Sequence, residues 1–569
     1  MPKGKGEKFL RALTVRLLPV FAYVAVFSFG VNLLLLIPPL YMLQVFDRAL
    51  TSRHMETLAL LTAAALGALL IMAMLDVLRA RLVAGSAIIL DRMLGPQVIE
   101  RLVVSAARGG SAELAQGLRD VSVLRAFLTG QGIVAAFDAP WLPLFLILIA
   151  LFHPLLGVVA LAGALLLVAL GIFNERATRG SLEEMHRGGR HASRFIDGSL
   201  RNAEAIHAMG MVKDVTARWQ RMNDAALAGL ARATQLGGSV TGMTKFARQG
   251  IQIGMLAAGA YLVLEQHVTS GVMMAATIIL GRALAPVESL IAGWRGLVDA
   301  KQAYRRLGEL LDKEREPEAQ TELPQPRGAL AVEAVSFRFS GRESPVLRNV
   351  TFALGAGEAL GLIGPSASGK STLARIIVGI WRPLTGAARL DGADLASWPR
   401  AQLGRFIGYL PQDVELFAGT IAENIARLGE VDSAAVVRAA QRARCHEMIL
   451  RLPLGYDTVL GEGGLGISPG QRQRVALARA LFADPRLVVL DEPNANLDGE
   501  GEEALLAAMR ELKSAGVTLI LIAHRPSLLS SVDKLLLLRD GAVEMFGPCQ
   551  EVMARVTRGP RPLRAQADA

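Results

Sequence analysis

Cysteine is nearly absent from this chain of 569 residues, in which only Cys445 and Cys549 occur. Two cysteines are too few for a disulfide framework, and they are also too few for a zinc site ligated by cysteine. Disulfide-dependent folds belong to oxidising compartments. The scarcity of cysteine therefore indicates domains that lie in a reducing compartment.

Charged residues are scarce as well, because they make up 20% of the chain while hydrophobic residues make up 52%. An average protein has about 25% charged residues. This composition excludes a disordered or fibrous protein and argues against a wholly soluble one. Lys and Arg outnumber Asp and Glu by 61 to 51, which gives a net charge of +10. That excess is compatible with a nucleic-acid partner or with a membrane protein whose cytosolic loops are basic.

The hydrophobic residues are concentrated before residue 300. A helix needs about 20 residues to cross the hydrocarbon core of a membrane. Four long runs meet this length, and two weaker runs qualify as a pair around a tight turn. We therefore expect six transmembrane helices rather than a set of buried core helices. The six runs are 19–43, 58–75, 133–152, 155–173, 251–264 and 272–291.

The charges between these runs predict their orientation. The N-terminal segment is basic. The long connection before the third run holds six Arg from Arg81 to Arg125, and the one before the fifth run holds twelve Lys or Arg from Arg176 to Arg248. The short connections after the third and fifth runs hold none. The positive-inside rule therefore places the N-terminus and both long connections in the cytosol. This topology accounts for the basic excess, so we expect no nucleic-acid partner.

The longer connection, residues 174–249, has a helix-forming composition and no proline. We expect it to fold as a helical hairpin. Each arm of the hairpin would be about 50 Å long at 1.5 Å per residue. Arms of that length would project beyond the bilayer and reach toward a cytosolic element.

The composition changes near residue 312. Residues 312–327 are rich in acids and contain three prolines, which is typical of a linker. Beyond the linker, short apolar strands are expected at 359–363, 487–490 and 517–522, with helices between them. The predicted organisation is a helical membrane domain over 1–311, the linker, an α/β domain over 328–556 and a disordered tail over 557–569.

A glycine-rich turn follows the first of these strands and matches the complete phosphate-binding motif G-x-x-x-x-G-K-[ST]. Backbone N–H groups of the turn and of the next helix would cradle the phosphates of a nucleotide. Lys370 would reach the β- and γ-phosphates, and the Ser371 hydroxyl would ligate Mg²⁺. The predicted nucleotide-binding residues of this motif are Gly364, Pro365, Ser366, Ala367, Ser368, Gly369, Lys370, Ser371 and Thr372.

The strand at 487–490 ends in two acids, Asp491 and Glu492. Asp491 would hold Mg²⁺ through its water shell. Glu492 would then polarise the attacking water as the general base. Together with the phosphate-binding turn, this pair predicts an enzyme that hydrolyses a nucleoside triphosphate and uses Mg²⁺.

Residues 468–474 read Ser-Pro-Gly-Gln-Arg-Gln-Arg and resemble the signature motif of ATP-binding-cassette (ABC) exporters. The resemblance extends over nearly the whole chain, and it implies a homodimer in which each signature motif contacts the γ-phosphate held by the opposing subunit. It implies catalytic roles for Glu492 and His524, the latter as the switch histidine that contacts the γ-phosphate. It implies Gln412 of the Q-loop as a residue at the metal, together with Ser371 and Asp491. The other residues that it implies are Phe339 for adenine stacking, Asp498 of the D-loop, and Ser468, Pro469, Gly470 and Gln471 of the signature.

Some positions depart from the commonest pattern of the family. Ile467 and Pro469 stand where leucine and glycine are usual, and Phe339 stands where tyrosine is usual. We expect Ser468 to be the N-cap, and Pro469 the first residue, of a helix over 469–482 whose positive end faces the phosphate. Because Glu492 is present, the site is expected to hydrolyse ATP.

Two membrane segments, 41–52 and 137–145, resemble the type I secretion ABC transporters, and in particular their short protease/lipase-exporter branch. Related chains that process leader peptides carry a cysteine peptidase domain before the first span. Here 18 residues precede Pro19 and no cysteine occurs before Cys445, so we expect no processing of cargo by this chain. A lipid or drug exporter of the same fold is the alternative, since fold does not determine cargo. Glu492 and His524 argue against a cassette protein that only gates or regulates.

The resemblance implies an ABC exporter half-transporter, with an all-α six-helix transmembrane domain that has long cytosolic helical extensions, followed by an α/β P-loop nucleotide-binding domain. It implies a multi-pass protein of the bacterial inner membrane whose nucleotide-binding domain is cytosolic. As a homodimer among membrane lipids, it would use ATP to export an unfolded protein substrate with a C-terminal signal, of the protease/lipase or calcium-repeat type. The implied partners are a periplasmic adaptor (membrane fusion protein) and an outer-membrane channel protein.

Asp138 lies in the third apolar run, near Pro140 and Pro143. An acid within a membrane indicates a functional role by default. The alternative, which we favour, is an interfacial Asp that is paired with an Arg. The prolines are expected to kink this span.

Overall fold

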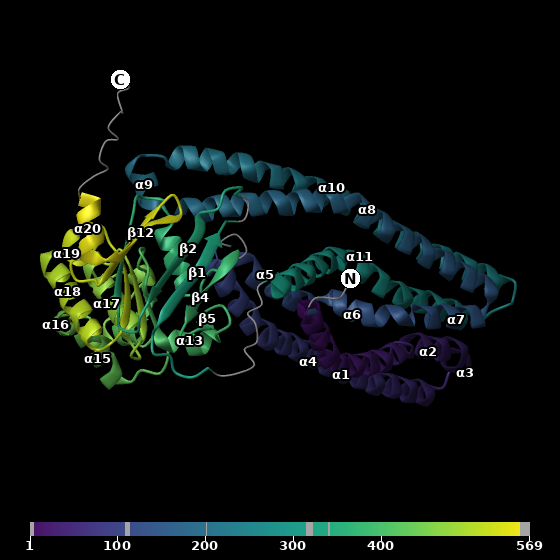
Figure 1. Ribbon diagram of the computed structural model, residues 1–569. Helices are drawn as coiled ribbons and strands as arrows, with labels where there is room; N and C mark the ends of the chain where they lie inside the picture. The colour runs from purple at the N-terminus through teal and green to yellow at the C-terminus, as the bar shows by residue number, and fades with distance from the viewer. Residues whose placement is uncertain (1–4, 109–113, 201, 314–322, 340–341, 558–569) are drawn as a thin grey trace, which may run out of the picture. The chain divides into compact units, whose positions relative to one another are not determined.

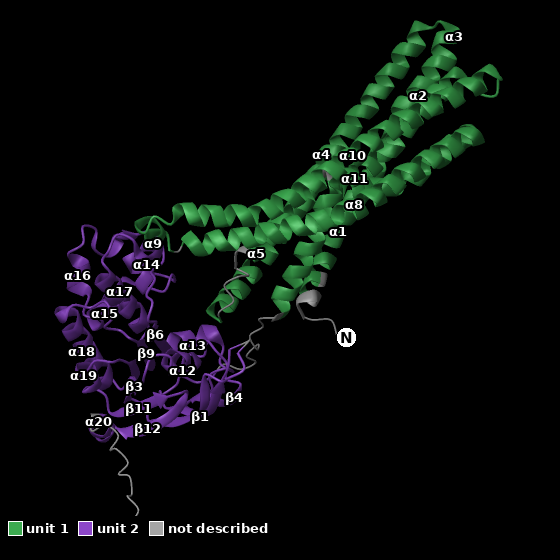
Figure 2. Ribbon diagram, turned by 90° about the horizontal axis from the view of Figure 1, so that it is seen from above, with its two compact units in different colours: residues 1–315 green, residues 316–569 purple. Residues whose placement is uncertain are grey.

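The computed structural model describes residues 5–108, 114–200, 202–313, 323–339 and 342–557. The chain divides into two compact units, Met1–Arg315 and Glu316–Ala569 (Figure 2). Each unit is described by itself. Most of the predicted linker, at 314–322, and the predicted tail from 558 lie outside the described residues.

Every described element of unit 1 is a helix (Figure 1). A π-helical turn, Val45–Ala49, separates α2 from α3, and a 3₁₀ turn, Ala139–Trp141, separates α6 from α7. The second turn contains Pro140, in agreement with the expected break in this span. The α-helices are α1 Lys5–Leu34, α2 Ile37–Gln44, α3 Leu50–Ser52, α4 Met55–Ala107, α5 Leu114–Thr129, α6 Gln131–Asp138, α7 Leu142–Phe152, α8 Pro154–Leu200, α9 Ala203–Ala208, α10 Val212–Leu264 and α11 Ser270–Lys313.

Five helical segments in the described part of the chain are long and apolar enough to cross a membrane. They contain five of the six predicted runs. The remaining run, 251–264, ends α10 but is short, and Lys245 and Arg248 precede it, so this helix does not reach the same hydropathy. The most apolar window of α4 has none of its residues buried in the chain, as expected for a helix that faces lipid. The five segments are Ala12–Ser52, Met55–Ala107, Gly132–Phe152, Pro154–Leu200 and Ser270–Asp312.

The predicted helical hairpin is confirmed by α8 and α10, which have 47 and 53 residues and pack along each other with α9 at the turn (Figures 1 and 2). Glycines bring the two helices close together. A Cβ at Gly229 would lie 2.9 Å from the backbone N of Met185, and one at Gly188 would lie 3.0 Å from the backbone N of Ala226. These contacts leave no room for a larger side chain at either position, so the arms pack backbone against backbone.

Asp138, at the end of α6, is paired with an arginine, as the favoured interpretation predicted. Its Oδ1 lies 2.8 Å from Nη1 of Arg79 in α4, and it also accepts hydrogen bonds from Ser28 and Asn32 of α1. Arg79 is buried and has a second carboxylate partner, Asp76, at 2.7 Å. The buried cluster therefore ties three helices together through one guanidinium and one carboxylate.

Unit 2 contains a six-stranded sheet of order β12-β11-β3-β10-β9-β6, in which all strands but β12 run parallel. A separate antiparallel sheet has the order β2-β1-β4-β5, and β7 pairs with β8. The strands are β1 Leu330–Phe337, β2 Leu347–Leu354, β3 Ala359–Ile363, β4 Thr385–Leu390, β5 Ala393–Asp394, β6 Ile407–Leu410, β7 Gly419–Thr420, β8 Val459–Leu460, β9 Leu487–Asp491, β10 Thr518–Ile522, β11 Lys534–Arg539 and β12 Ala542–Pro548.

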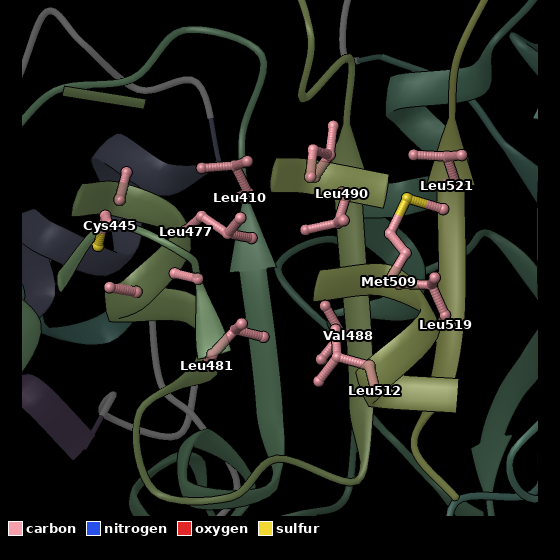
Figure 3. Packing of buried hydrophobic residues seen from close by; sticks show 14 of the residues in the cluster. Leu410, Cys445, Leu477, Leu481, Val488, Leu490, Met509, Leu512, Leu519 and Leu521 are labelled. Atoms are coloured by element: carbon pink, nitrogen blue, oxygen red, sulfur yellow. The ribbon is translucent and has the colours of Figure 1, made fainter. Parts of the chain in front are cut away.

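Helices cover the six-stranded sheet, and its central strands are fully buried, as expected for a parallel sheet. On one face, Leu477 and Leu481 pack near β6 while Met509 and Leu512 pack on β9 and β10 (Figure 3). A second apolar cluster fills the space toward the antiparallel sheet. The helices are α12 Lys370–Ile377, α13 Arg400–Phe406, α14 Ile421–Ile425, α15 Ser433–Arg442, α16 His446–Leu450, α17 Pro469–Leu481, α18 Gly499–Ser514, α19 Pro526–Leu529 and α20 Cys549–Thr557.

The buried pair in unit 1 predicts a stability effect. Asp138→Ala would leave the Arg79 guanidinium buried without this partner, so we expect the free energy of unfolding to fall by about 3 kcal/mol. The thermal unfolding midpoint of the purified chain in detergent measures this loss. Asp91→Ala breaks the more exposed pair with Arg125 and is the matched control, for which we expect less than about 1 kcal/mol. Equal midpoints for the two variants would contradict the prediction.

Candidate nucleotide-binding site

The phosphate-binding turn follows the buried strand β3 and is possible only with glycine at its ends. Gly364 has φ +151°, and a Cβ there would lie 2.1 Å from the carbonyl oxygen of Leu538. Gly369 has φ +101° and directly precedes α12. Within the turn, Pro365, Ser366 and Ala367 are exposed, whereas Ser368, Gly369, Lys370 and Thr372 are buried. The backbone therefore forms an open loop at a helix N-terminus, the usual geometry for binding phosphate.

Lys370 curls back over this loop. Its Nζ donates hydrogen bonds of 2.9 Å to the carbonyl oxygens of Gly364 and Pro365. Burial lowers the pKa of Lys370, and the carboxylates of Glu492 and Asp491 oppose that shift. The ammonium group is thus held at the loop, beside the two acids that the sequence predicted.

Asp491 ends β9 and is almost completely buried, at 1% exposure. Burial raises its pKa, a hydrogen bond from the Ser371 hydroxyl opposes the increase, and the charge of Glu492 adds to it. Its Oδ1 has no hydrogen-bond partner in the described part of the chain. A buried carboxylate oxygen with a free lone pair, next to a hydroxyl, is an arrangement that fits Mg²⁺, which prefers oxygen ligands.

Glu492 is placed by the strands on either side of it. It has φ +49°, and its backbone N–H donates to the carbonyl of Ile522 at the end of β10, at 3.0 Å. Its carboxylate accepts a 3.0 Å hydrogen bond from Nε2 of Gln412 and lies 3.5 Å from Nε2 of His524. The structure therefore brings together the predicted general base, the Q-loop glutamine and the switch histidine, which follow three different strands.

The ring of Phe339 belongs to an aromatic cluster. It lies 5.2 Å, edge to face, from both Phe337 and Trp381. Phe337 and Trp381 stack in parallel, also at 5.2 Å. Sequence reasoning missed Trp381, because it follows α12 and nothing in its local pattern connects it with Phe339.

The signature motif begins α17 as expected. The Ser468 side chain caps the helix by accepting from the backbone N–H of Gln471, and the Gln471 side chain accepts from the N–H of Ser468. Pro469 is the first helical residue. The helix ends at Leu481, one residue before the predicted end, because Phe482 already has an extended backbone.

The D-loop packs against this helix. A Cβ at Gly470 would lie 2.9 Å from the carbonyl oxygen of Asn496. Gln473, which sequence reasoning missed, is buried and accepts a 3.2 Å hydrogen bond from the N–H of Asn496. Asp498 caps α18 by accepting from the N–H of Gly501 at 2.8 Å, and it pairs with Arg474. The signature and the D-loop therefore form one connected surface.

Known proteins support these observations. The chain matches the family "ABC transporter" over residues 347–495 and the family "ABC transporter transmembrane region" over 20–284. It is 44% identical over 540 residues to the type I secretion system ATP-binding protein PrsD of Rhizobium meliloti, with 95% of this chain and 93% of the relative covered. The chain belongs to the type I secretion ABC transporters.

This type I secretion ABC transporter is also 32% identical to the cyclolysin secretion/processing ATP-binding protein CyaB of Bordetella pertussis, over 93% of this chain and 75% of that relative. A bacterial Atm1-family ABC exporter solved with ATP bound has a TM-score of 0.81 at 25% identity, covering 97% of this chain and 99% of that one. The expected ABC exporter fold is therefore confirmed. The chain is a multi-pass membrane protein with an ATP-binding domain, and it is an ATPase coupled to transport.

Two acids at this site should respond in opposite directions to loss of charge. Burial raises the pKa of Asp491, so the folded chain loses stability as the pH rises from the unfolded value of about 3.9 through the folded pKa. Asp491→Asn should therefore raise the unfolding midpoint at pH 7 without nucleotide. The hydrogen bond from Gly501 lowers the pKa of Asp498, so its carboxylate stabilises the fold at pH 7 and Asp498→Asn should lower the midpoint.

Thermal unfolding of the full chain at pH 7 and at acidic pH measures both effects. Below both pKa values the differences from the wild type should shrink, because the wild-type acids are then protonated in the folded and unfolded chain. A lower midpoint for Asp491→Asn at pH 7 would show that burial is not the dominant effect on this carboxylate.

Proposed function

We propose that this chain is the ATP-hydrolysing inner-membrane component of a type I secretion system. It would export unfolded proteins with a C-terminal signal through a periplasmic adaptor and an outer-membrane channel. The observation that carries the proposal is the 44% identity to the type I secretion protein PrsD over 95% of the chain. This similarity favours protein export over the export of lipids or drugs by the same fold. CyaB, whose name assigns it to cyclolysin secretion, supports the same conclusion.

We propose the following parts in ATP hydrolysis for the residues of the site. The loop at 364–369 and Lys370 would bind the phosphates, so Lys370 would exchange its carbonyl partners for phosphate oxygens. Ser371 and Asp491 would hold Mg²⁺, which when bound neutralises charge on the phosphates. Gln412 donates a hydrogen bond to Oε2 of Glu492, and the remaining lone pairs of the carboxylate would accept a proton from the attacking water.

A homodimer is proposed because the chain has one phosphate-binding loop and one signature motif. The Ser468 oxygen accepts a hydrogen bond from Gln471, so its hydroxyl hydrogen is available for an anion. In the dimer, this hydroxyl and the first turn of α17 would face the γ-phosphate bound by the partner. The α8–α10 hairpin would carry the resulting motion to the membrane helices.

Replacement of Glu492 tests the chemistry. We expect Glu492→Gln to bind ATP with unchanged affinity but to lower kcat by at least about 100-fold, which is the usual contribution of a general base. Turnover and equilibrium binding of ATP are measured on the purified full chain. Glu430→Gln changes an exposed acid in the same unit and is the matched control. Wild-type turnover in Glu492→Gln would remove Glu492 from this role.

Reconstitution tests the transport class. We expect the chain to cross-link to a periplasmic adaptor and to move a C-terminal cargo segment across a membrane only with ATP. The same vesicles report movement of labelled lipid. Lipid transport at the full ATP-dependent rate, without adaptor contact, would contradict protein secretion while leaving the ATPase assignment intact.

A further inference from the structure

Arg375 lies in α12, one turn after Ser371, and has no role in the site as described so far. Its guanidinium carbon lies 4.9 Å from the centre of the Trp381 ring. The backbone joins the same two residues, because the N–H of Trp381 donates to the carbonyl of Arg375 at 3.2 Å. A cation that lies over the face of an indole ring is attracted to the ring, and the attraction is stronger when the two groups are shielded from water. Trp381 is only 8% exposed. Arg375 therefore holds Trp381 by its side chain and by its backbone.

Trp381 in turn determines the orientation of the rings in the aromatic cluster. Its ring stacks on Phe337 with an interplanar angle of 1° and meets the ring of Phe339 at 85°. Phe337 is the last residue of β1 in the antiparallel sheet, and Phe339 follows two residues later. Edge-to-face and stacked pairs each favour one relative orientation. The orientation of Phe339 thus depends on a tryptophan that the α12 arginine holds in place.

The Arg375 guanidinium also interacts with groups of the parallel sheet. Burial raises the pKa of the Tyr409 phenol, the charge of Asp491 adds to that, and a hydrogen bond from Arg375 opposes it. Arg375 also acts electrostatically on Asp491. Tyr409 is in β6 and Asp491 ends β9, so the charge of this one side chain acts on groups of two strands of the parallel sheet. A planar guanidinium can stack on a ring and donate a hydrogen bond at its edge at the same time, whereas an ammonium cannot.

We propose that Arg375 is a positioning residue for the base of ATP. Its guanidinium fastens the ring cluster of Phe337, Phe339 and Trp381 to α12, the helix that begins at the phosphate-binding loop. The base contact and the phosphate contact of one nucleotide would then have a fixed separation. The inference rests on the proposed ATP site, since it assigns Phe339 to the base.

Comparison of ATP with inorganic tripolyphosphate separates the two contacts, because only ATP has a base. Dissociation constants for both are measured with Mg²⁺ on the full chain, in the Glu492→Gln background so that ATP is not consumed. We expect Arg375→Met to weaken ATP binding about tenfold, within the range of a shielded cation–π contact, and to leave tripolyphosphate binding unchanged. Arg375→Lys should recover only part of the loss, because it keeps the charge but not the planar group.

Two further variants complete the design. Tyr409→Phe removes only the hydroxyl that restrains Arg375, and it should weaken ATP binding in the same sense by a smaller factor. Arg389→Met is the control, because Arg389 pairs with the exposed Glu333 on the antiparallel sheet, outside the site. The unfolding midpoint of each variant shows that it is folded, and Arg375→Lys and Tyr409→Phe carry the test if Arg375→Met does not fold.

Several outcomes would overturn the proposal. Unchanged ATP binding in Arg375→Met would remove the role, and equal loss of ATP and tripolyphosphate binding would show a general effect on the site. Full recovery in Arg375→Lys would show that charge alone suffices. Phe339→Ala separates this result from failure of the proposed site. If Phe339→Ala binds ATP normally, the base does not lie on Phe339, whereas loss in Phe339→Ala with no loss in Arg375→Met overturns only the role of Arg375.

Discussion

The nucleotide site depends on the parallel register of the six-stranded sheet. Ile522 of β10 is opposite Asp491 of β9, and the next backbone N–H along the chain, that of Glu492, donates to the carbonyl of Ile522. This hydrogen bond continues the ladder one residue beyond β9 and determines where the Glu492 side chain leaves the sheet. Because successive side chains of a strand point to opposite faces, a slip of one residue would turn Asp491 and Glu492 each to the opposite face of the sheet. The proposed metal ligand and the proposed general base would then both be misplaced.

The groups at the same edge of the sheet lower the stability of the folded chain. Lys370 and Asp491 are buried, and the Asp491 Oδ1 and Ser368 Oγ atoms have no partner within the described residues. A buried polar atom without a partner costs about 1–3 kcal/mol. Groups of this kind are retained where a ligand satisfies them, and the ligand then returns stability in proportion to its concentration. The two apolar clusters on either side of the parallel sheet stabilise the unit that bears this cost.

Much of the site could be predicted because its residues follow strands and sit in contiguous motifs. The turn at 364–371 and the pair Asp491–Glu492 each adjoin a buried strand and contain the residue types that their proposed chemistry requires. The local sequence pattern was therefore enough to predict them. Trp381, Arg375 and Gln473 escaped prediction, since their roles come from contacts with residues far away in the sequence. The pairing of Asp138 was expected, but its partner Arg79 lies 59 residues away on another helix and had no signal of its own. The run at 251–264 has a weak local signal. It was predicted to span the membrane because it pairs with the next run around a tight turn, and not because of its own hydropathy.

The first turn of α17 supports the proposed homodimer on electrostatic grounds. A helix N-terminus carries about half a positive charge, and its first N–H groups lack partners within the helix. The Ser468–Gln471 pair satisfies some of these groups, but the first turn has no acidic residue, and Arg472 and Arg474 follow it. Arg474 is neutralised by Asp498, and the anion that would complement the helix end is not an acidic residue of its own first turn. One chain has one loop to hold phosphates and one such helix. If the phosphates bound by a second copy supply that anion, ATP becomes part of the interface, and its hydrolysis weakens the contact that it had formed.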